Sequence, residues 1–109
     1  MNGYQVTFFT ERNQRQGGQQ KHEWLLDLAM SLGIGGGTVI DCAEGSGRSG
    51  KMHMVHLFSL RDQPMEVTMA MTEAQLDALF ARLEAEKANM FYLKAACEFG
   101  KAGASVATP

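Results

Sequence analysis

The sequence predicts an α+β fold in which two helices cover one face of an antiparallel sheet. Two segments, Tyr4–Thr10 and Met65–Met71, alternate apolar and polar residues as strands buried on one face do. Two others, Lys21–Leu32 and the segment after Thr72, repeat apolar residues at helical spacing. With a strand expected after each helix, the order becomes βαββαβ, the ferredoxin-like arrangement of split βαβ units.

The elements of the first half are bounded by turn and helix-stop residues. β-branched and aromatic residues fill Tyr4–Thr10, whereas the polar, glycine-interrupted Glu11–Gln20 predicts a loop. The helix over Lys21–Leu32 is expected to end at Gly33, because glycine is typical of the position after a helix. The second strand is expected at Thr38–Ala43.

In the second half, the best-defined element is the second helix. Thr72-Glu73-Ala74-Gln75 matches a capping box, so the helix is expected to begin there and to run to about Lys87. Leucine and phenylalanine residues then recur on one face of this helix. The aromatic and apolar segment Met90–Phe99 predicts the last strand.

The segment from Arg48 to Asp62 supports two interpretations. KMHMVHLFSL, residues 51–60, fits a strand, and it equally fits the wall of a long mobile loop; Arg61–Pro64 predicts a turn. Gly and Ser dominate just before it. Few apolar contacts are available there to offset the entropy of ordering the chain, so residues 46–51 are expected to be the most mobile internal segment.

Composition favours a single globular domain. The chain has 109 residues, 45% hydrophobic and 20% charged, so one domain over residues 1–100 with a disordered tail at 101–109 is expected. A net charge of −2 gives no basis for nucleic-acid binding. No apolar run approaches the ~18 residues of a membrane span, so no direct membrane insertion is expected. Without a signal-peptide pattern, we expect a cytoplasmic location with Cys42 and Cys97 as reduced, buried thiols.

One face of the predicted sheet mixes apolar and polar side chains. Its two best-defined strands would present Gln5, Thr7, Phe9, Glu66, Thr68 and Ala70. Such a face is too apolar to remain wholly in water and too polar for the core of a monomer. Partial burial in an oligomer is therefore expected.

The glycine-rich stretch from Gly33 to Lys51 contains the main candidate binding site. Glycines on both sides of the second strand suggest backbone packed closely against something. In residues 45–51, successive backbone N–H groups can form an anion-binding nest, and Arg48 and Lys51 add positive charge. The pattern is neither a Walker A loop nor a dinucleotide fingerprint. A flexible loop without a ligand fits the local sequence as well.

His53 and His56 suggest a second kind of site, for a soft metal. Imidazole and the thioethers of this methionine-rich chain suit copper. However, a spacing of three residues puts the two histidines on opposite faces of a strand, so one ion would require a helical or irregular segment. No nucleophile, base and orienting group can be assembled from the sequence, so no catalytic residues and no enzyme activity are expected.

The glycine-rich block resembles the PII signalling superfamily. There, a helix is followed by G-I-x-G-x-T-V, a few residues, G-x-G and a long excursion. The matching residues are Gly33, Ile34, Gly36, Thr38, Val39, Gly45 and Gly47. The resemblance is closest to the small, uncharacterised PII-like branch, in which Glu44-Gly45-Ser46-Gly47 and His53 have counterparts. It extends over about residues 4 to 99, with its specific part in this block.

The resemblance implies a homotrimer that binds adenine nucleotides in the clefts between subunits. Gly36, Gly37 and Thr38 would line the adenine side of the cleft, with Gly45 and Gly47 at the base of a long loop. That loop, about residues 46 to 64, would change shape on binding and dock on a membrane transporter or a metabolic enzyme. From the local sequence rather than the resemblance, we expect Arg48 and Lys51 within this loop to pair with a charged ligand.

Two departures from the classical pattern affect the expected ligand and its control. Glu86–Phe91 has a lone lysine and no glycine where classical PII proteins carry a second phosphate-binding loop. ATP is therefore less expected than AMP, a cyclic nucleotide, bicarbonate or another small anion. Residues 46–64 contain no tyrosine, so control by uridylylation is not expected.

The alternative function is a metal-binding or metal-tolerance protein of the same fold, using His53, His56 and methionines. The segment at residues 51–60 discriminates between the two functions. A mobile loop there favours the sensor, and a regular strand that completes a rigid sheet favours the metal protein.

Overall fold

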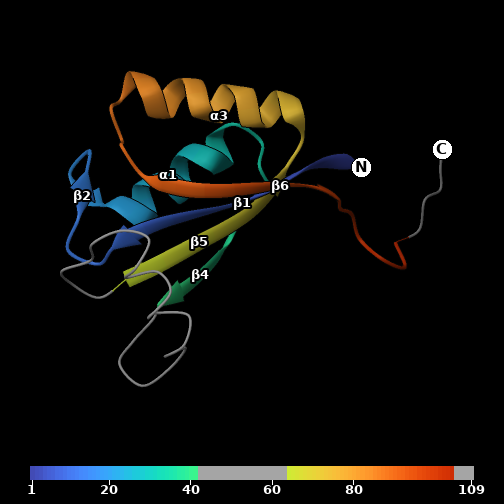
Figure 1. The fold of residues 1–109 in the computed structure, drawn as a ribbon, viewed down its shortest axis with the longest axis horizontal. Helices are drawn as coiled ribbons and strands as arrows, with labels where there is room; N and C mark the ends of the chain where they lie inside the picture. The colour runs from blue at the N-terminus through green and yellow to red at the C-terminus, as the bar shows by residue number, and fades with distance from the viewer. Residues whose placement is uncertain (42–63, 105–109) are drawn as a thin grey trace.

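The structure, a computed structural model, describes residues 1–41 and 64–104 (Figure 1). Its main sheet consists of β1 (Asn2–Glu11), β4 (Thr38–Asp41), β5 (Pro64–Met71) and β6 (Phe91–Glu98). Its helices are α1 (Lys21–Ser31) and α3 (Glu73–Ala85). A second, small sheet pairs β2 (Arg15–Gln16) with β3 (Gln19–Gln20).

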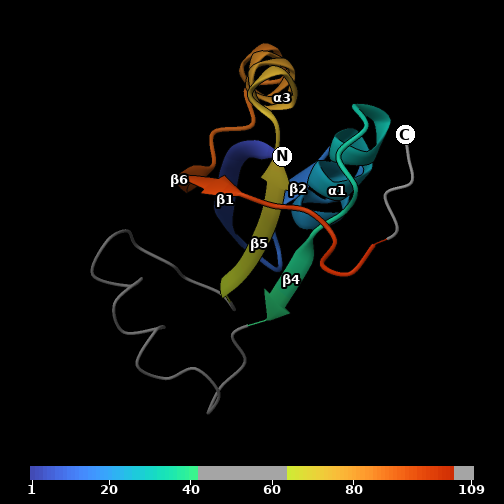
Figure 2. The ribbon, with the colours of Figure 1, turned by 90° about the vertical axis from the view of Figure 1, so that its right-hand side faces the viewer.

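The main sheet is antiparallel throughout, with the strand order β4-β5-β1-β6. In each βαβ unit, the helix therefore connects two strands that have a third strand between them in the sheet, which is the ferredoxin-like topology. Figure 2 shows α1 and α3 on the same side of the sheet. The predicted α+β fold with two helices on one face is confirmed.

The core lies between the helices and the strand residues that point towards them. In the β1–β5 register, Val6 is opposite Met69 and Phe8 is opposite Val67, and all four are at most 2% exposed. The helices contribute their apolar stripes, with Leu25, Leu28, Ala29, Leu76, Leu79 and Leu83. Burial of each large apolar side chain contributes about 1.5–3 kcal/mol, so this layer is the main source of stability.

Hydrogen bonds at the helix ends fix the start of the glycine-rich segment. Gly33 N–H donates to the Met30 carbonyl at 3.1 Å and Ile34 N–H donates to the Ala29 carbonyl at 3.0 Å, the Schellman pattern. At the other helix, Thr72 and Gln75 form the predicted capping box, worth about 1 kcal/mol. The Gln75 amide also donates to the Gly33 carbonyl at 2.9 Å and ties the two helix ends together.

Part of the predicted loop at Glu11–Gln20 is a short hairpin, so that prediction is wrong. Gly17 and Gly18 have φ of 59° and 83°, as in the type I′ turn that joins two antiparallel strands. The Arg15 guanidinium donates to the Gly18 carbonyl at 2.8 Å and closes the turn. The flanking residues are polar, so no alternation of apolar residues marked these strands.

Several sequence predictions fall outside the described residues. They are the end of the second strand at residues 42–43, the strand or loop at 51–60, the turn before Pro64 and the mobility of residues 46–51. Residues 101–104 are exposed and contain no helix or strand, and disorder of the tail to residue 109 stays a prediction. In the described part of the chain, no helix has the length and apolarity required to cross a membrane.

Candidate ligand site on the outer sheet face

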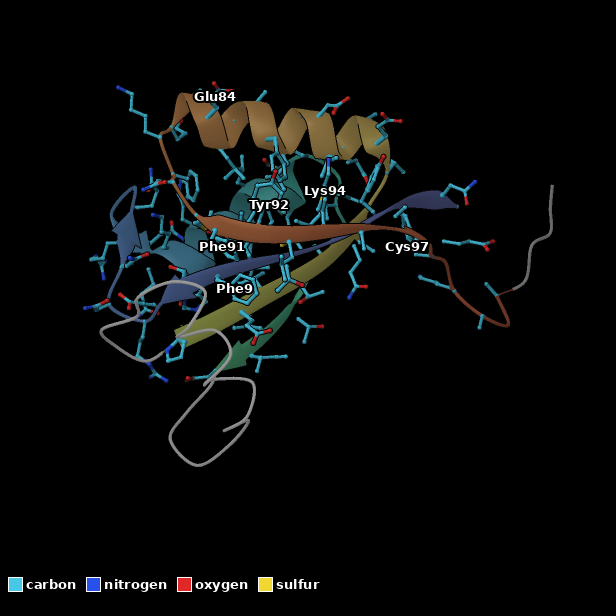
Figure 3. All side chains as sticks on the ribbon, viewed as in Figure 1. Phe9, Glu84, Phe91, Tyr92, Lys94 and Cys97 are labelled. Carbon is cyan, nitrogen blue, oxygen red and sulfur yellow. The ribbon has the colours of Figure 1, made fainter. Side chains whose placement is uncertain are left out.

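The sheet face opposite the helices carries the mixture of side chains that the sequence predicts. In the observed register Gln5 faces Ala70, Thr7 faces Thr68 and Phe9 faces Glu66. The edge strands add three apolar side chains that are 39–53% exposed: Ile40, Phe91 and Leu93. Figure 3 shows Phe9 and Phe91 close together here, and their ring centroids are 5.6 Å apart.

A hollow of about 590 Å³ lies at one end of this face. The connection before β4 lines one side of it with Gly35–Thr38. Gln5, Thr68 and Ala70 line its floor, and Cys97–Phe99 at the end of β6 line the other side. Three of the predicted ligand residues, Gly36, Gly37 and Thr38, therefore lie together in one concave site.

Packing requires glycine at one of the three glycine positions of this site, and backbone conformation favours it at another. A Cβ on Gly37 would lie 2.8 Å from Met69 Cγ and 3.1 Å from the Thr68 carbonyl oxygen, so packing against β5 demands glycine. Gly36 has a φ of 123°, which other residues rarely adopt. A Cβ on Gly35 or Gly36 would meet no atom within 4 Å. These two glycines leave space beside the hollow.

Hydrogen bonds hold the floor and the far wall of the hollow. Thr7 Oγ1 and Thr68 Oγ1 are 3.0 Å apart, with Thr38 next to Thr68 in the register. Phe99 N–H donates to the Met1 carbonyl at 2.9 Å, and the Met1 ammonium donates to the Phe99 carbonyl at 3.0 Å. The pairing of β1 with β6 thus continues past the strand ends and fixes this wall.

Cys97 is a free thiol, as the sequence predicts, but it is not buried. It lies on the outer face of the edge strand β6, opposite Gly3, which has no side chain to cover it. The prediction of a buried thiol is therefore wrong for Cys97. Cys42 lies outside the described residues.

The lining of the hollow is almost without charge. Glu98 is its single charged side chain among the described residues, and no lysine, arginine or histidine of that part of the chain reaches it. Hydroxyl, amide and backbone groups surround the space instead. The hollow therefore suits a neutral, flat polar group such as a nucleobase better than a phosphate, which requires cations.

The cations that the sequence predicts for this site belong to a segment that begins at the far end of β4. The strand leads from Thr38 in the hollow to Asp41, whose carboxylate pairs with Arg12. Beyond it, the predicted ligand residues Gly45, Gly47, Arg48 and Lys51 lie outside the described residues. The structure therefore leaves their role in binding untested.

The turn at Glu86–Met90 lies at the opposite end of β6 from the hollow. The strand has eight residues, so roughly 25 Å separate the two places in one chain. Lys87 and Asn89 in this turn have φ of 54° and 52°, and the turn has no glycine. One chain alone does not bring this lysine to the hollow.

The metal alternative has no support within residues 1–41 and 64–104. No group of three or more His, Cys, Asp or Glu residues there is placed to hold a metal ion. His53 and His56 lie outside this part of the chain. Burial lowers the pKa of the Lys21 ammonium, which lies at the start of α1 and does not line the hollow.

Sequence reasoning found one side of this hollow and missed the rest. Alternation placed Gln5, Thr68 and Ala70 on the outer face without linking them to the glycines. The glycines meet these outer-face residues because β5 and β1 lie next to β4 in the sheet, and this strand order depends on pairing between distant parts of the chain. No local pattern in the sequence predicts that Cys97–Phe99 line the hollow.

Comparison with known proteins gives a family and a set of similar folds. The profile of the family DUF190, described as "Uncharacterized ACR, COG1993", matches residues 3–99. A search of curated proteins finds no match.

Solved structures with the same fold include CPII from Thiomonas intermedia K12 bound to ADP, AMP and acetate. This structure is 17% identical to the chain with a TM-score of 0.62, and the match covers 92% of this chain and 90% of that chain. A second CPII structure, described as a nitrogen regulatory PII-like protein bound to ADP, AMP and bicarbonate, has 14% identity and a TM-score of 0.61, covering 93% and 96%. A proposed PII-like signaling protein from Thermus thermophilus has 17% identity and a TM-score of 0.57, covering 89% and 87%.

Proposed function

The chain belongs to the DUF190 family within the PII-like superfamily, and we propose that it is a trimeric regulatory protein that binds an adenine nucleotide without catalysing a reaction. One observation carries this proposal: the nearly uncharged hollow on the outer sheet face, beside Gly35–Thr38. CPII, which shares the fold, binds ADP and AMP. We place the base of the nucleotide in this hollow.

The phosphate end of the ligand requires charge that the hollow lacks. Arg48 and Lys51 can supply it, and the backbone N–H groups of Gly45 and Gly47 can add hydrogen bonds. The turn at Glu86–Met90 offers one lysine and no glycine. AMP or another nucleotide with few phosphates is therefore a better match than ATP. A small anion such as bicarbonate, which CPII binds, is a second ligand that these groups could hold.

The exposed apolar side chains of the outer face support a trimer. Leu93 and Ile40 are 53% and 47% exposed, on the two edge strands of the main sheet. A face with such side chains is normally covered, and an edge strand offers backbone groups to a neighbouring chain. In a trimer with these faces turned towards one another, each hollow is closed by a second chain. The ligand would then sit between subunits.

Signalling would pass through the loop at residues 46–64. Ligand contact at its base restricts the loop, and a membrane transporter or a metabolic enzyme binds one of its conformations, an order–disorder switch. The partner and the cytoplasmic location predicted from the sequence stay predictions.

Gly35→Leu tests the site directly. The variant should fold normally, because a Cβ at this position meets no atom within 4 Å. Its side chain should occupy space beside the hollow and weaken AMP binding about ten-fold or more, equal to at least 1.4 kcal/mol. Isothermal titration calorimetry measures the affinity, and thermal unfolding checks the fold. Gly100→Leu is the matched control, since its Cβ also meets no atom within 4 Å and Gly100 does not line the hollow. Equal AMP affinity in the two variants would show that AMP does not bind in this hollow.

A further inference from the structure

We propose that a second hollow, between α3 and β6, binds a linear polyamine, independently of the nucleotide site. This hollow has a volume of about 460 Å³, which is the size of a small-molecule site rather than of a peptide groove. Residues of α3 form one side of it, and the start of β6 with the turn before it forms the other. The hollow therefore lies on the helix side of the sheet, away from the outer face that we assign to the nucleotide and to subunit contact.

Three aromatic rings form the base of this hollow. The rings of Phe80 and Tyr92 meet edge to face with centroids 4.8 Å apart, and the Phe8 ring lies 5.9 Å from that of Phe80 and 6.4 Å from that of Tyr92. Phe8 is buried, whereas Tyr92 is 41% exposed. An exposed aromatic ring attracts a cation to its face and also packs against methylene groups. A ligand that carries both kinds of group suits this base.

Two carboxylates border the same space. Asp77 and Glu84 are exposed on α3 and line the hollow, and two helical turns, about 10 Å along the axis, separate them on one side of the helix. Ala81 lies between them, and its short side chain leaves room for a ligand. Neither carboxylate forms a hydrogen bond or an ion pair with a residue that the structure describes. The hollow thus presents two negative charges at a spacing that the helix fixes.

The charge of this hollow favours a cationic ligand. No lysine, arginine or histidine of the described part of the chain lines it, and Arg82 of α3 pairs with Glu86 at 3.6 Å. Two residues after Tyr92, on the same side of β6, Lys94 places its Nζ 5.1 Å from the centroid of the Tyr4 ring (Figure 3). The chain therefore supplies a cation to the aromatic ring at that position, and the described residues supply none at Tyr92.

A linear polyamine matches the carboxylates and the aromatic base together. Its ammonium groups can pair with Asp77 and Glu84 while its methylene chain lies over Tyr92. In extended spermidine, the terminal ammonium groups are separated by a distance comparable to the spacing of the two carboxylates. A monoamine can satisfy only one of them, and the two negative charges disfavour a phosphate. The hollow should therefore select its ligand by the number and spacing of positive charges.

Four substitutions test the carboxylates and the ring. Asp77→Asn and Glu84→Gln each remove one charge and keep the shape of the side chain. Tyr92→Leu removes the aromatic ring. Glu23→Gln is the matched control, because it makes the same change of charge at an exposed position of α1 that does not line the hollow.

The experiment is calorimetric titration of the full-length chain and its variants with spermidine and with propylamine. The native chain should bind spermidine at one site per chain and about ten-fold or more tighter than propylamine, because spermidine adds a second ion pair and more contact with the ring. Asp77→Asn, Glu84→Gln and Tyr92→Leu should each weaken spermidine binding about three-fold, and the double carboxylate variant about ten-fold. Glu23→Gln should keep the native affinity.

Four results would overturn the inference. They are the absence of saturable spermidine binding, equal affinity for spermidine and propylamine, binding of magnesium ions as tight as that of spermidine, and equal weakening by the double carboxylate variant and by Glu23→Gln. The last result would show that spermidine responds to the net charge of the surface and not to this hollow. Circular dichroism checks the fold of each variant. Should Tyr92→Leu fail to fold, the carboxylate variants decide alone, since Asp77 and Glu84 are exposed.

Discussion

A Leu93→Glu variant is expected to lose the trimer and, with it, nucleotide binding. Leu93 is 53% exposed on the outer face of β6 and lies opposite Thr7 in the register, within the face that we assign to subunit contact. In an isolated chain a glutamate there remains solvated. In the trimer it would be buried without a partner at each of the three equivalent positions, at several kcal/mol for each charge. The assembled state should therefore be the one that is destabilised.

Sedimentation equilibrium measures this effect directly. The native chain should give about three times 11.9 kDa, and Leu93→Glu should give the mass of one chain with unchanged secondary structure. Ala78→Glu is the control, since Ala78 is exposed on α3, away from the outer face. A Leu93→Glu variant that remains a trimer would show that the outer face is not the contact surface.

Gly37→Ala is expected to lower the free energy of unfolding by about 2 kcal/mol, within the range of overpacked sites. The added methyl group would approach Met69 Cγ to 2.8 Å and both Leu26 Cδ2 and the Thr68 carbonyl oxygen to 3.1 Å. Met69 is buried in the core and Thr68 O is backbone, so neither can move away easily. The entry into β4 would have to shift, which would also reshape the hollow.

Gly35→Ala provides the matched comparison for this second effect. Its methyl group meets no atom within 4 Å, so its urea unfolding midpoint should stay close to the native value. If the two variants unfold at the same urea concentration, the close packing of Gly37 against β5 does not contribute to stability as the structure indicates.

Much of the fold could be predicted because its signals are local. The alternation that includes Val6 and Phe8 identifies β1, and the capping box at Thr72 and Gln75 identifies the start of α3. Gly33 marks the end of α1. Each signal operates within a few residues and depends on helix or strand geometry alone, so no knowledge of the remaining chain was required.

The remaining features depend on contacts between distant residues. Gln5 joins Thr38 and Phe99 in one hollow only because of the strand order, and the partial exposure of Cys97 follows from the position of β6 at an edge. The β2–β3 hairpin is polar on both strands and therefore has no hydrophobic pattern. The structure places Gly36, Gly37 and Thr38 on one side of the hollow, and their binding of a ligand stays a prediction.

The most direct test of the central claim is calorimetric titration of the native trimer with AMP. The account predicts saturable binding with a stoichiometry of one nucleotide per chain, because every chain contributes one hollow on its outer face. The titration should extend to millimolar AMP, so that a dissociation constant as weak as about 1 mM, roughly 4 kcal/mol of binding free energy, is still measured. Absence of any saturable heat with AMP or ADP at such concentrations would contradict the account.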